Sequence, residues 1–214
     1  MQRIELPTRY FRAQAEKLDW AVADAIRRSH SGQPVLIGTR TIGQSRDLAE
    51  RFTGQKHPFQ LLNGVQDQEE SLLIAKAGQS ETIGCITIAT NMAGRGTDIK
   101  PDQNALAAGG LHVIGLERNS SARIDRQLLG RAGRQGDPGS GQFLVSADDN
   151  LLLRYGKTLV RKIEKIREAV GIESRSFDVR IQQIQKIAEK ESYQQRQSVM
   201  REELWLDKIK KLVG

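Results

Sequence analysis

Short apolar runs recur along the first two thirds of the chain, and each is four to six residues long. They read PVLIG (34–38), FQLLN (59–63), CITIA (85–89), LHVIGL (111–116) and QFLVS (142–146). Unbroken apolar runs of this length are typical of strands that are buried on both faces. The pattern therefore predicts five buried strands.

Helical spacing of apolar residues separates these runs. Four helices are expected, over about 9–29, 41–54, 67–78 and 120–133. Thr41 and Gln44 have the spacing of a capping box, and Asp67 and Glu70 repeat it. Strands that alternate with helices predict an α/β fold: a mostly parallel sheet with helices on both faces. Ligands of such sheets bind at the carboxyl ends of the strands.

The pattern changes at about Asn150. Apolar residues step by three and four from Leu152 to Val170, which predicts one amphipathic helix that Gly171 ends. Ser174 then begins a longer helix toward Leu212 with only a weak apolar stripe. A helix of this kind needs other domains to pack against. We expect a sheet domain over residues 1–149 and a long-helix α appendage over residues 150–214.

Charge follows the same division. Residues 1–149 carry 18 basic and 17 acidic side chains, whereas residues 150–214 carry 15 and 9, which together give the net charge of +7. The basic surplus of the helical segment permits contact with anionic lipid, nucleic acid or an acidic partner, or is simply a solvated face. The single cysteine, Cys85, excludes an internal disulfide. No apolar run is long enough to span a bilayer, and a soluble, cytoplasmic protein is expected.

Two glycine-containing segments carry the candidate chemistry. ATNMAGRGTDI (89–99) follows the third apolar run and includes Gly94, Arg95 and Asp98. QLLGRAGRQG (127–136) places Arg131 and Arg134 three residues apart, which on a helix puts both guanidinium groups on one face. Paired guanidinium groups suit a phosphate chain. We expect both segments at the carboxyl ends of neighbouring strands, close to one nucleotide.

The rest of a nucleotide-hydrolysing site is missing from the pattern. A Walker A loop needs a strand and a glycine five residues before GK[ST], but Leu151 stands five residues before the GKT of 156–158. Asp148 and Asp149 lack the glutamate that follows a Walker B aspartate. The three histidines are scattered, and no metal site is expected within the chain. The arginines would therefore act on a nucleotide that another domain holds, and the chain by itself should not hydrolyse ATP.

On these residues the chain resembles the SecA family of ATP-driven protein-export motors. The resemblance rests on GQPVLIGT (32–39), ATNMAGRGTDI (89–99), GGLHVIGLERNSSARIDRQLLGRAGRQGD (109–137) and ESRSFDVR (173–180). It implies the second RecA-like motor domain, of the superfamily 2 helicase C-terminal type, followed by part of the helical scaffold. Leu129, Gly43 and Arg46 depart from residues that are usual in the family.

The resemblance also implies roles for single residues. Gly94, Arg95 and Asp98 would bind the nucleotide, with Asp98 as a direct ligand. Arg131 and Arg134 would be phosphate-sensing, arginine-finger-like residues, and Gln127 would couple the nucleotide to domain movement. The cofactor would be ATP, with Mg²⁺ held by the first motor domain.

The implied partners are the first motor domain, the SecYEG channel, preproteins and anionic phospholipid, at the cytoplasmic face of the inner membrane. Two alternatives stay open. A superfamily 2 RNA or DNA helicase domain is compatible with the basic charge, although aromatic residues make up only 5% of the chain, which leaves few platforms for base stacking. A non-enzymatic interaction module would use residues 150–214 as a basic docking arm.

Overall fold

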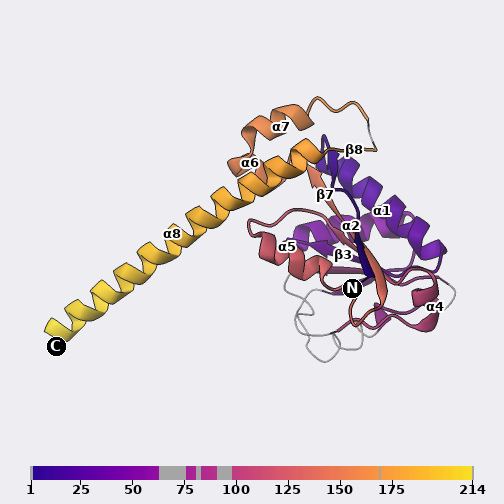
Figure 1. Ribbon diagram of the computed structural model, residues 1–214, viewed down its shortest axis with the longest axis horizontal. Coiled ribbons are helices and arrows are strands. Elements are labelled where there is room, and N and C mark those ends of the chain that lie inside the picture. The colour runs from indigo at the N-terminus through magenta and orange to yellow at the C-terminus, as the bar shows by residue number, and fades with distance from the viewer. Residues whose placement is uncertain (1, 63–75, 81–82, 91–97, 169, 214) are drawn as a thin grey trace.

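One sheet forms the centre of the molecule in the computed structural model, which describes residues 2–62, 76–80, 83–90, 98–168 and 170–213 (Figure 1). Its strands lie in the order β4-β5-β3-β6-β7-β2-β8, and β1 also pairs with β7. All pairings are parallel except that of β2 with β8. The predicted α/β fold with a mostly parallel sheet is confirmed.

The five predicted strands are present, with bounds close to those of the apolar runs. They are β3 (Val35–Thr39), β4 (Gln60–Leu62), β5 (Ile86–Thr90), β6 (Leu111–Gly115) and β7 (Pro138–Ser146). Every residue of β3, β5 and β6 is buried. Because these strands have helices on both faces, none of their side chains faces water, and the sequence therefore shows no polar alternation.

Helices cover the sheet on two faces. On one face, α1 (Gln14–His30) and α2 (Ile42–Gly54) pack through residues such as Val22 and Phe52 against Ile37 and Ile88. On the other face, α5 (Ala122–Leu129) packs Leu129 into a second cluster of strand residues. Short α4 (Gln103–Ala107) precedes β6. Thr41 caps α2 as predicted, because its side chain accepts a hydrogen bond from the backbone nitrogen of Gln44.

The amino terminus differs from the sequence prediction. Residues 9–11, predicted as the start of a helix, form strand β2 (Arg9–Phe11), and β1 (Gln2–Glu5) precedes it. Both strands lie parallel to β7, which runs long enough to pair with each in turn. Tyr10 and Phe11 are fully buried there. Most of the helix predicted over 67–78, including Asp67 and Glu70, lies outside the described residues.

The carboxy-terminal segment is also different in detail. Gly156 divides the single helix predicted for residues 150–170 into α6 (Asn150–Tyr155) and α7 (Lys157–Ile163). A Cβ atom at Gly156 would lie 2.9 Å from the side chain of Ile184, which belongs to the long carboxy-terminal helix, so a larger residue would collide with that helix. After β8 (Ile172–Glu173), helix α8 (Arg175–Val213) runs past this pair and then away from the sheet (Figure 1).

The first turns of α8 belong to a third apolar cluster, which joins it to α6, α7 and the sheet. Tyr10, Val145, Leu152, Ile163 and Ile184 are among its buried members. The long-helix appendage is therefore confirmed and is anchored on strands β2 and β7. No helix in the described part of the chain is long and apolar enough to cross a membrane. The boundary at residues 149 and 150 stays a prediction.

Candidate functional site

Asp98 and Arg134 meet although 36 residues separate them in the chain. Arg134 Nη1 donates to Asp98 Oδ1 at 2.9 Å, and Gln135 Nε2 donates to Asp98 Oδ2 at 3.2 Å. The side chains of Arg134 and Asp98 are 39% and 30% exposed, so the pair is open to a ligand. Asp98 of the first segment therefore lies beside Arg134 and Gln135 of the second.

The main chain fixes the orientation of Arg134. Helix α5 ends at Leu129, and Gly130 is its C-cap residue. Arg134 Nε donates to the Gly130 carbonyl oxygen at 2.9 Å, which holds the guanidinium group against the end of the helix. The prediction that Arg131 and Arg134 lie on one face of a helix was wrong, because the glycine-containing segment after Leu129 turns instead of continuing the helix.

Positive φ angles shape this turn. Gly133 and Gly136 have φ angles of +65° and +95°, and Gln135 has a φ of +53°. Non-glycine residues rarely adopt this region. The conformation of Gln135 brings its amide to Asp98. Gln135 was not among the predicted site residues, and the only sequence signal for it is its place between two glycine-containing turns.

The site does not lie where the sequence predicted it. Residues 130–137 connect the end of α5 to Pro138, the first residue of β7, and so they lie at the amino end of this strand. The expectation that both segments lie at the carboxyl ends was wrong for the second segment, and Asp98 of the first segment lies in contact with the second. The cause is α5, which begins beyond the carboxyl end of β6 and runs back across the sheet.

The other predicted site residues are placed as follows. Arg131 lies half-buried in the turn after α5, where its backbone nitrogen donates to the Leu128 carbonyl oxygen at 3.1 Å. Gln127 lies exposed in the last turn of α5, three residues before Gly130, whose carbonyl oxygen accepts the hydrogen bond from Arg134. Gly94 and Arg95 lie outside the described residues.

The two sequences that resemble Walker motifs, GKT at 156–158 and Asp148-Asp149, have other places in the fold. Gly156 separates α6 from α7 and Lys157 begins α7, so no strand leads into the GKT sequence and it is not a phosphate loop. Asp149 is fully buried in an ion pair with Lys17, and Asp148 Oδ2 accepts a hydrogen bond from the backbone nitrogen of Gln14 at 2.7 Å. Burial raises the pKa of the Asp149 carboxyl to about 6, against the opposing effect of Lys17. Within the described ranges, no three His, Cys, Asp or Glu side chains are grouped to hold a metal.

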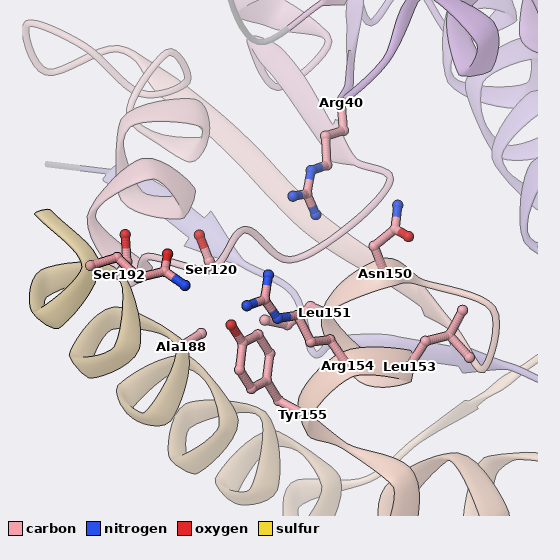
Figure 2. A pocket seen from close by; sticks show the side chains of 10 residues that line it. Arg40, Ser120, Asn150, Leu151, Leu153, Arg154, Tyr155, Ala188 and Ser192 are labelled. Atoms are coloured by element: carbon pink, nitrogen blue, oxygen red, sulfur yellow. The ribbon is translucent and has the colours of Figure 1, made fainter. Parts of the chain in front are cut away.

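A separate pocket of about 580 Å³ lies at the carboxyl ends of β3 and β6. Figure 2 shows the guanidinium group of Arg40 above that of Arg154, with Ser120 to one side and the Tyr155 ring below Arg154. Arg154 pairs with Glu191 of α8, and Arg40 Nη1 lies 3.7 Å from Glu117 Oε2. None of the described residues of the two motif segments lines this pocket.

Comparison with known proteins gives the family. A sequence model described as the SecA P-loop domain matches residues 1–106 and 100–175, which is most of the chain. The chain belongs to the SecA family. Among SecA relatives, protein translocase subunit SecA of Campylobacter curvus is 44% identical over 204 residues, which is 94% of this chain and 23% of that protein.

Other SecA proteins are similar to this chain over most of its length. SecA 3 of Magnetococcus marinus is 53% identical over 154 residues (70% of this chain, 22% of that protein), and SecA of Thermotoga maritima is 42% identical over 206 residues (95% and 23%). The chain thus spans less than a quarter of the length of these curated relatives.

Solved structures show the same fold at low sequence identity. The Escherichia coli DEAD-box protein SrmB has a TM-score of 0.55 at 20% identity, covering 81% of this chain and 95% of that chain. The yeast DEAD-box splicing factor Prp28 has a TM-score of 0.55 at 20% identity, covering 86% and 37%. The chain therefore shares the RecA-like fold of these two structures.

Proposed function

We propose that this chain is the nucleotide-sensing second motor domain, with part of the helical scaffold, of a SecA-type ATPase that drives preprotein translocation across the cytoplasmic membrane. The observation that carries the proposal is the ion pair between Asp98 and Arg134, which joins the two motif segments at one partly exposed place. Family membership supports nucleotide binding there.

The two arginines are proposed to stabilise the phosphate chain. Phosphoryl transfer depends mainly on positioning and on compensation of the charge that develops on the phosphate oxygens. A guanidinium group carries a positive charge and several donors in a fixed plane. The bond of Arg134 to the Gly130 carbonyl oxygen holds this group in one orientation. Arg131 lies in the same turn and is proposed to contact the same phosphates. The nucleotide supplies the phosphoryl group, and the chain supplies these cations.

Asp98 is proposed to have two functions. Its carboxylate orients Arg134 through the 2.9 Å contact, and a carboxylate has further lone pairs that can accept a hydrogen bond from a nucleotide hydroxyl. Gly94 and Arg95 are proposed to complete the nucleotide contact from the same segment. Gln127, on the helix that ends beside Arg134, is proposed to couple the nucleotide to domain movement.

The remaining partners follow from the family and are proposals for this chain. The first motor domain would hold ATP and Mg²⁺ through the Walker loops that this chain lacks. Residues 1–149 would then be the motor domain proper and residues 150–214 the scaffold segment. The SecYEG channel, preproteins and anionic phospholipid of the inner membrane are the partners that this assignment implies, since the relatives are named protein translocase subunits.

The test is nucleotide binding and turnover by the 214-residue chain alone. We expect weak, saturable ATP binding in a calorimetric titration, no steady hydrolysis, and loss of binding in Arg134→Ala. Arg126→Ala is the matched control, because Arg126 is an exposed arginine on α5. Steady hydrolysis that Arg134→Ala abolishes would overturn the proposal that the chain needs a second domain. Equal binding by both variants would overturn the assigned site.

A further inference from the structure

Helix α8 is hydrogen-bonded to the beginning of α5 through a buried glutamine. Gln185 Nε2 donates to Asp125 Oδ2 at 2.7 Å and to the Asn119 carbonyl oxygen at 2.9 Å. Gln185 is 4% exposed and Asp125 is 3% exposed. A buried amide that loses such partners costs free energy, so the contact fixes the distance between the two helices.

Asp125 is the centre of this contact. Its other carboxylate oxygen, Oδ1, accepts hydrogen bonds from the backbone nitrogen of Asn119 at 2.8 Å and from Asn119 Nδ2 at 3.1 Å. Arg118 Nη1 lies 3.4 Å from Asp125 Oδ2, and the same guanidinium group lies over the Phe143 ring at 4.0 Å. Asp125 thus ties α8, the loop before α5 and α5 itself to one carboxylate.

A second contact lies next to the first. The backbone nitrogen of Ala122, the first residue of α5, donates to Glu189 Oε1 of α8 at 3.2 Å. The first backbone N–H groups of a helix have no partner within the helix, and a carboxylate beside them is favourable. Gln185 and Glu189 are four residues apart and therefore face the same side of α8.

The far end of α5 holds the nucleotide-site arginine. The Gly130 carbonyl oxygen accepts from Arg134 Nε at 2.9 Å, and the Leu129 carbonyl oxygen accepts from Arg3 Nη1 at 3.4 Å. Helix α5 has only eight residues, so its two ends are rigidly connected. A displacement of its first turn by α8 must therefore move the carbonyl group that orients Arg134.

The space between α5 and α8 is not filled by apolar side chains. A pocket of about 360 Å³ lies there, and its lining includes Asp125, Leu129, Gln185 and Glu189. The polar contacts therefore set the position of α5 relative to α8 without a packed apolar interface around them.

We propose that Asp125 and Gln185 are positioning residues for the nucleotide site: together with Glu189 they couple α8 to α5 and so set the orientation of Arg134. This inference rests on the proposed function, because Arg134 is its end point. It adds a specific route by which a movement of the long helix reaches the phosphate-sensing arginine.

The experiment compares Gln185→Leu with Gln183→Leu. Gln183 is an exposed glutamine on the same helix, so both variants remove one amide from α8. In the 214-residue chain, the exchange of the Arg134 Nε proton with solvent is measured by nitrogen-15 NMR. We expect exchange to be about fivefold to tenfold faster in Gln185→Leu, as for the weakening of one hydrogen bond, and unchanged in Gln183→Leu.

A second readout is ATP turnover in a protein that contains both motor domains. Gln185→Leu should lower kcat on the order of tenfold and leave KM for ATP within about twofold, because positioning of a transition-state contact acts on kcat. If Gln185→Leu fails to fold, Glu189→Ala replaces it, because Glu189 is exposed, and a smaller effect of the same sign is expected.

The outcomes separate the two proposals. Unchanged Arg134 exchange in Gln185→Leu, or a lower melting temperature without any change at Arg134, overturns the coupling. Unchanged turnover in Arg134→Ala, together with faster Arg134 exchange in Gln185→Leu, overturns the proposed function and leaves the mechanical contact in place.

Discussion

Gly133 lies at the tightest point of the nucleotide-site turn. Its φ angle is +65°, and a Cβ atom there would stand 2.8 Å from the Arg3 Cβ atom and 3.1 Å from the Arg3 Cα atom. Arg3 belongs to β1, whose backbone is held by pairing with β7. The backbone of Arg3 cannot easily move away from the turn. Position 133 therefore requires glycine, both for its positive φ angle and for the close approach to Arg3.

Replacement of Gly133 by alanine should therefore destabilise the fold. We expect Gly133→Ala to lower the free energy of unfolding by about 2 kcal/mol or more in a denaturant titration, from the left-handed backbone and the contact with Arg3. Gly54→Ala is the control, since Gly54 ends α2 with no atom within 4 Å of its added Cβ. Equal stability of the two variants would contradict the described turn.

His112 makes the stability depend on pH. It is fully buried in β6, and its Nδ1 lies 2.7 Å from Ser140 Oγ. Burial, and then the nearby positive charge of Arg28, lowers the pKa of His112 from 6.5 to about 3, although Asp24 opposes this. Below pH 6.5 the unfolded chain binds a proton that the folded chain refuses, so this group makes stability fall as pH falls from about 6 toward 3.

The corresponding measurement is the free energy of unfolding between pH 7 and pH 4. His112 should contribute up to about 1.4 kcal/mol per pH unit to the loss of stability on acidification. His112→Asn should have a shallower pH dependence, whereas His30→Asn, at an exposed position, should keep that of the wild type. Parallel curves for all three proteins would show that His112 is not the group responsible.

At the scale of elements, the third apolar cluster determines how α8 is held. Ile184 of α8 is 6% exposed in that cluster, whereas Ile187, less than one turn later, is 55% exposed. Ile184→Ala should cost about 2 to 4 kcal/mol of unfolding free energy, since the side chain leaves a cavity between α8 and α6. Ile187→Ala should change the unfolding free energy by less than about 0.5 kcal/mol. A small effect of Ile184→Ala would mean that α8 is not anchored there.

The buried strands could be predicted because their pattern is local. VLIGT, ITIAT and LHVIG are mostly apolar, and each forms a strand in which every residue is buried. Arg9, Tyr10 and Phe11 could not be assigned in the same way, because their strand pairs with β7 and β8, both more than 130 residues later in the chain. The break at Gly156 likewise depends on the distant Ile184 side chain.

The sequence pointed to Asp98 and Arg134 as candidate site residues, but the geometry of their contact could not be predicted from it. Spacing singled out Asp98 and Arg134, and the fold joins them. Their place at the amino end of β7 depends on where α5 ends. The sequence alone did not show that the helix ends at Leu129, before the glycines at 130, 133 and 136. Asp125 and Gln185 carry no sequence signal, because each is one polar residue on an amphipathic helix.

At the scale of the whole molecule, we predict that this chain does not bind single-stranded RNA at moderate salt. Tyr193 is the one aromatic residue among the exposed large apolar side chains whose exposure the structure describes, up to residue 203. Few stacking platforms and a basic arm predict only weak, salt-sensitive contact with nucleic acid. A titration with single-stranded RNA at moderate salt should show no binding, and salt-resistant binding would favour the helicase alternative.

The most direct test of the nucleotide site is ATP turnover in a protein that contains both motor domains. Arg134→Ala should lower turnover by about 10³-fold or more, as for loss of an arginine finger, while ATP binding, measured on the same samples, persists. Arg126→Ala, on the exposed side of α5, should turn over ATP at the wild-type rate. Wild-type turnover in Arg134→Ala would contradict the assignment of the Asp98 and Arg134 pair to nucleotide sensing.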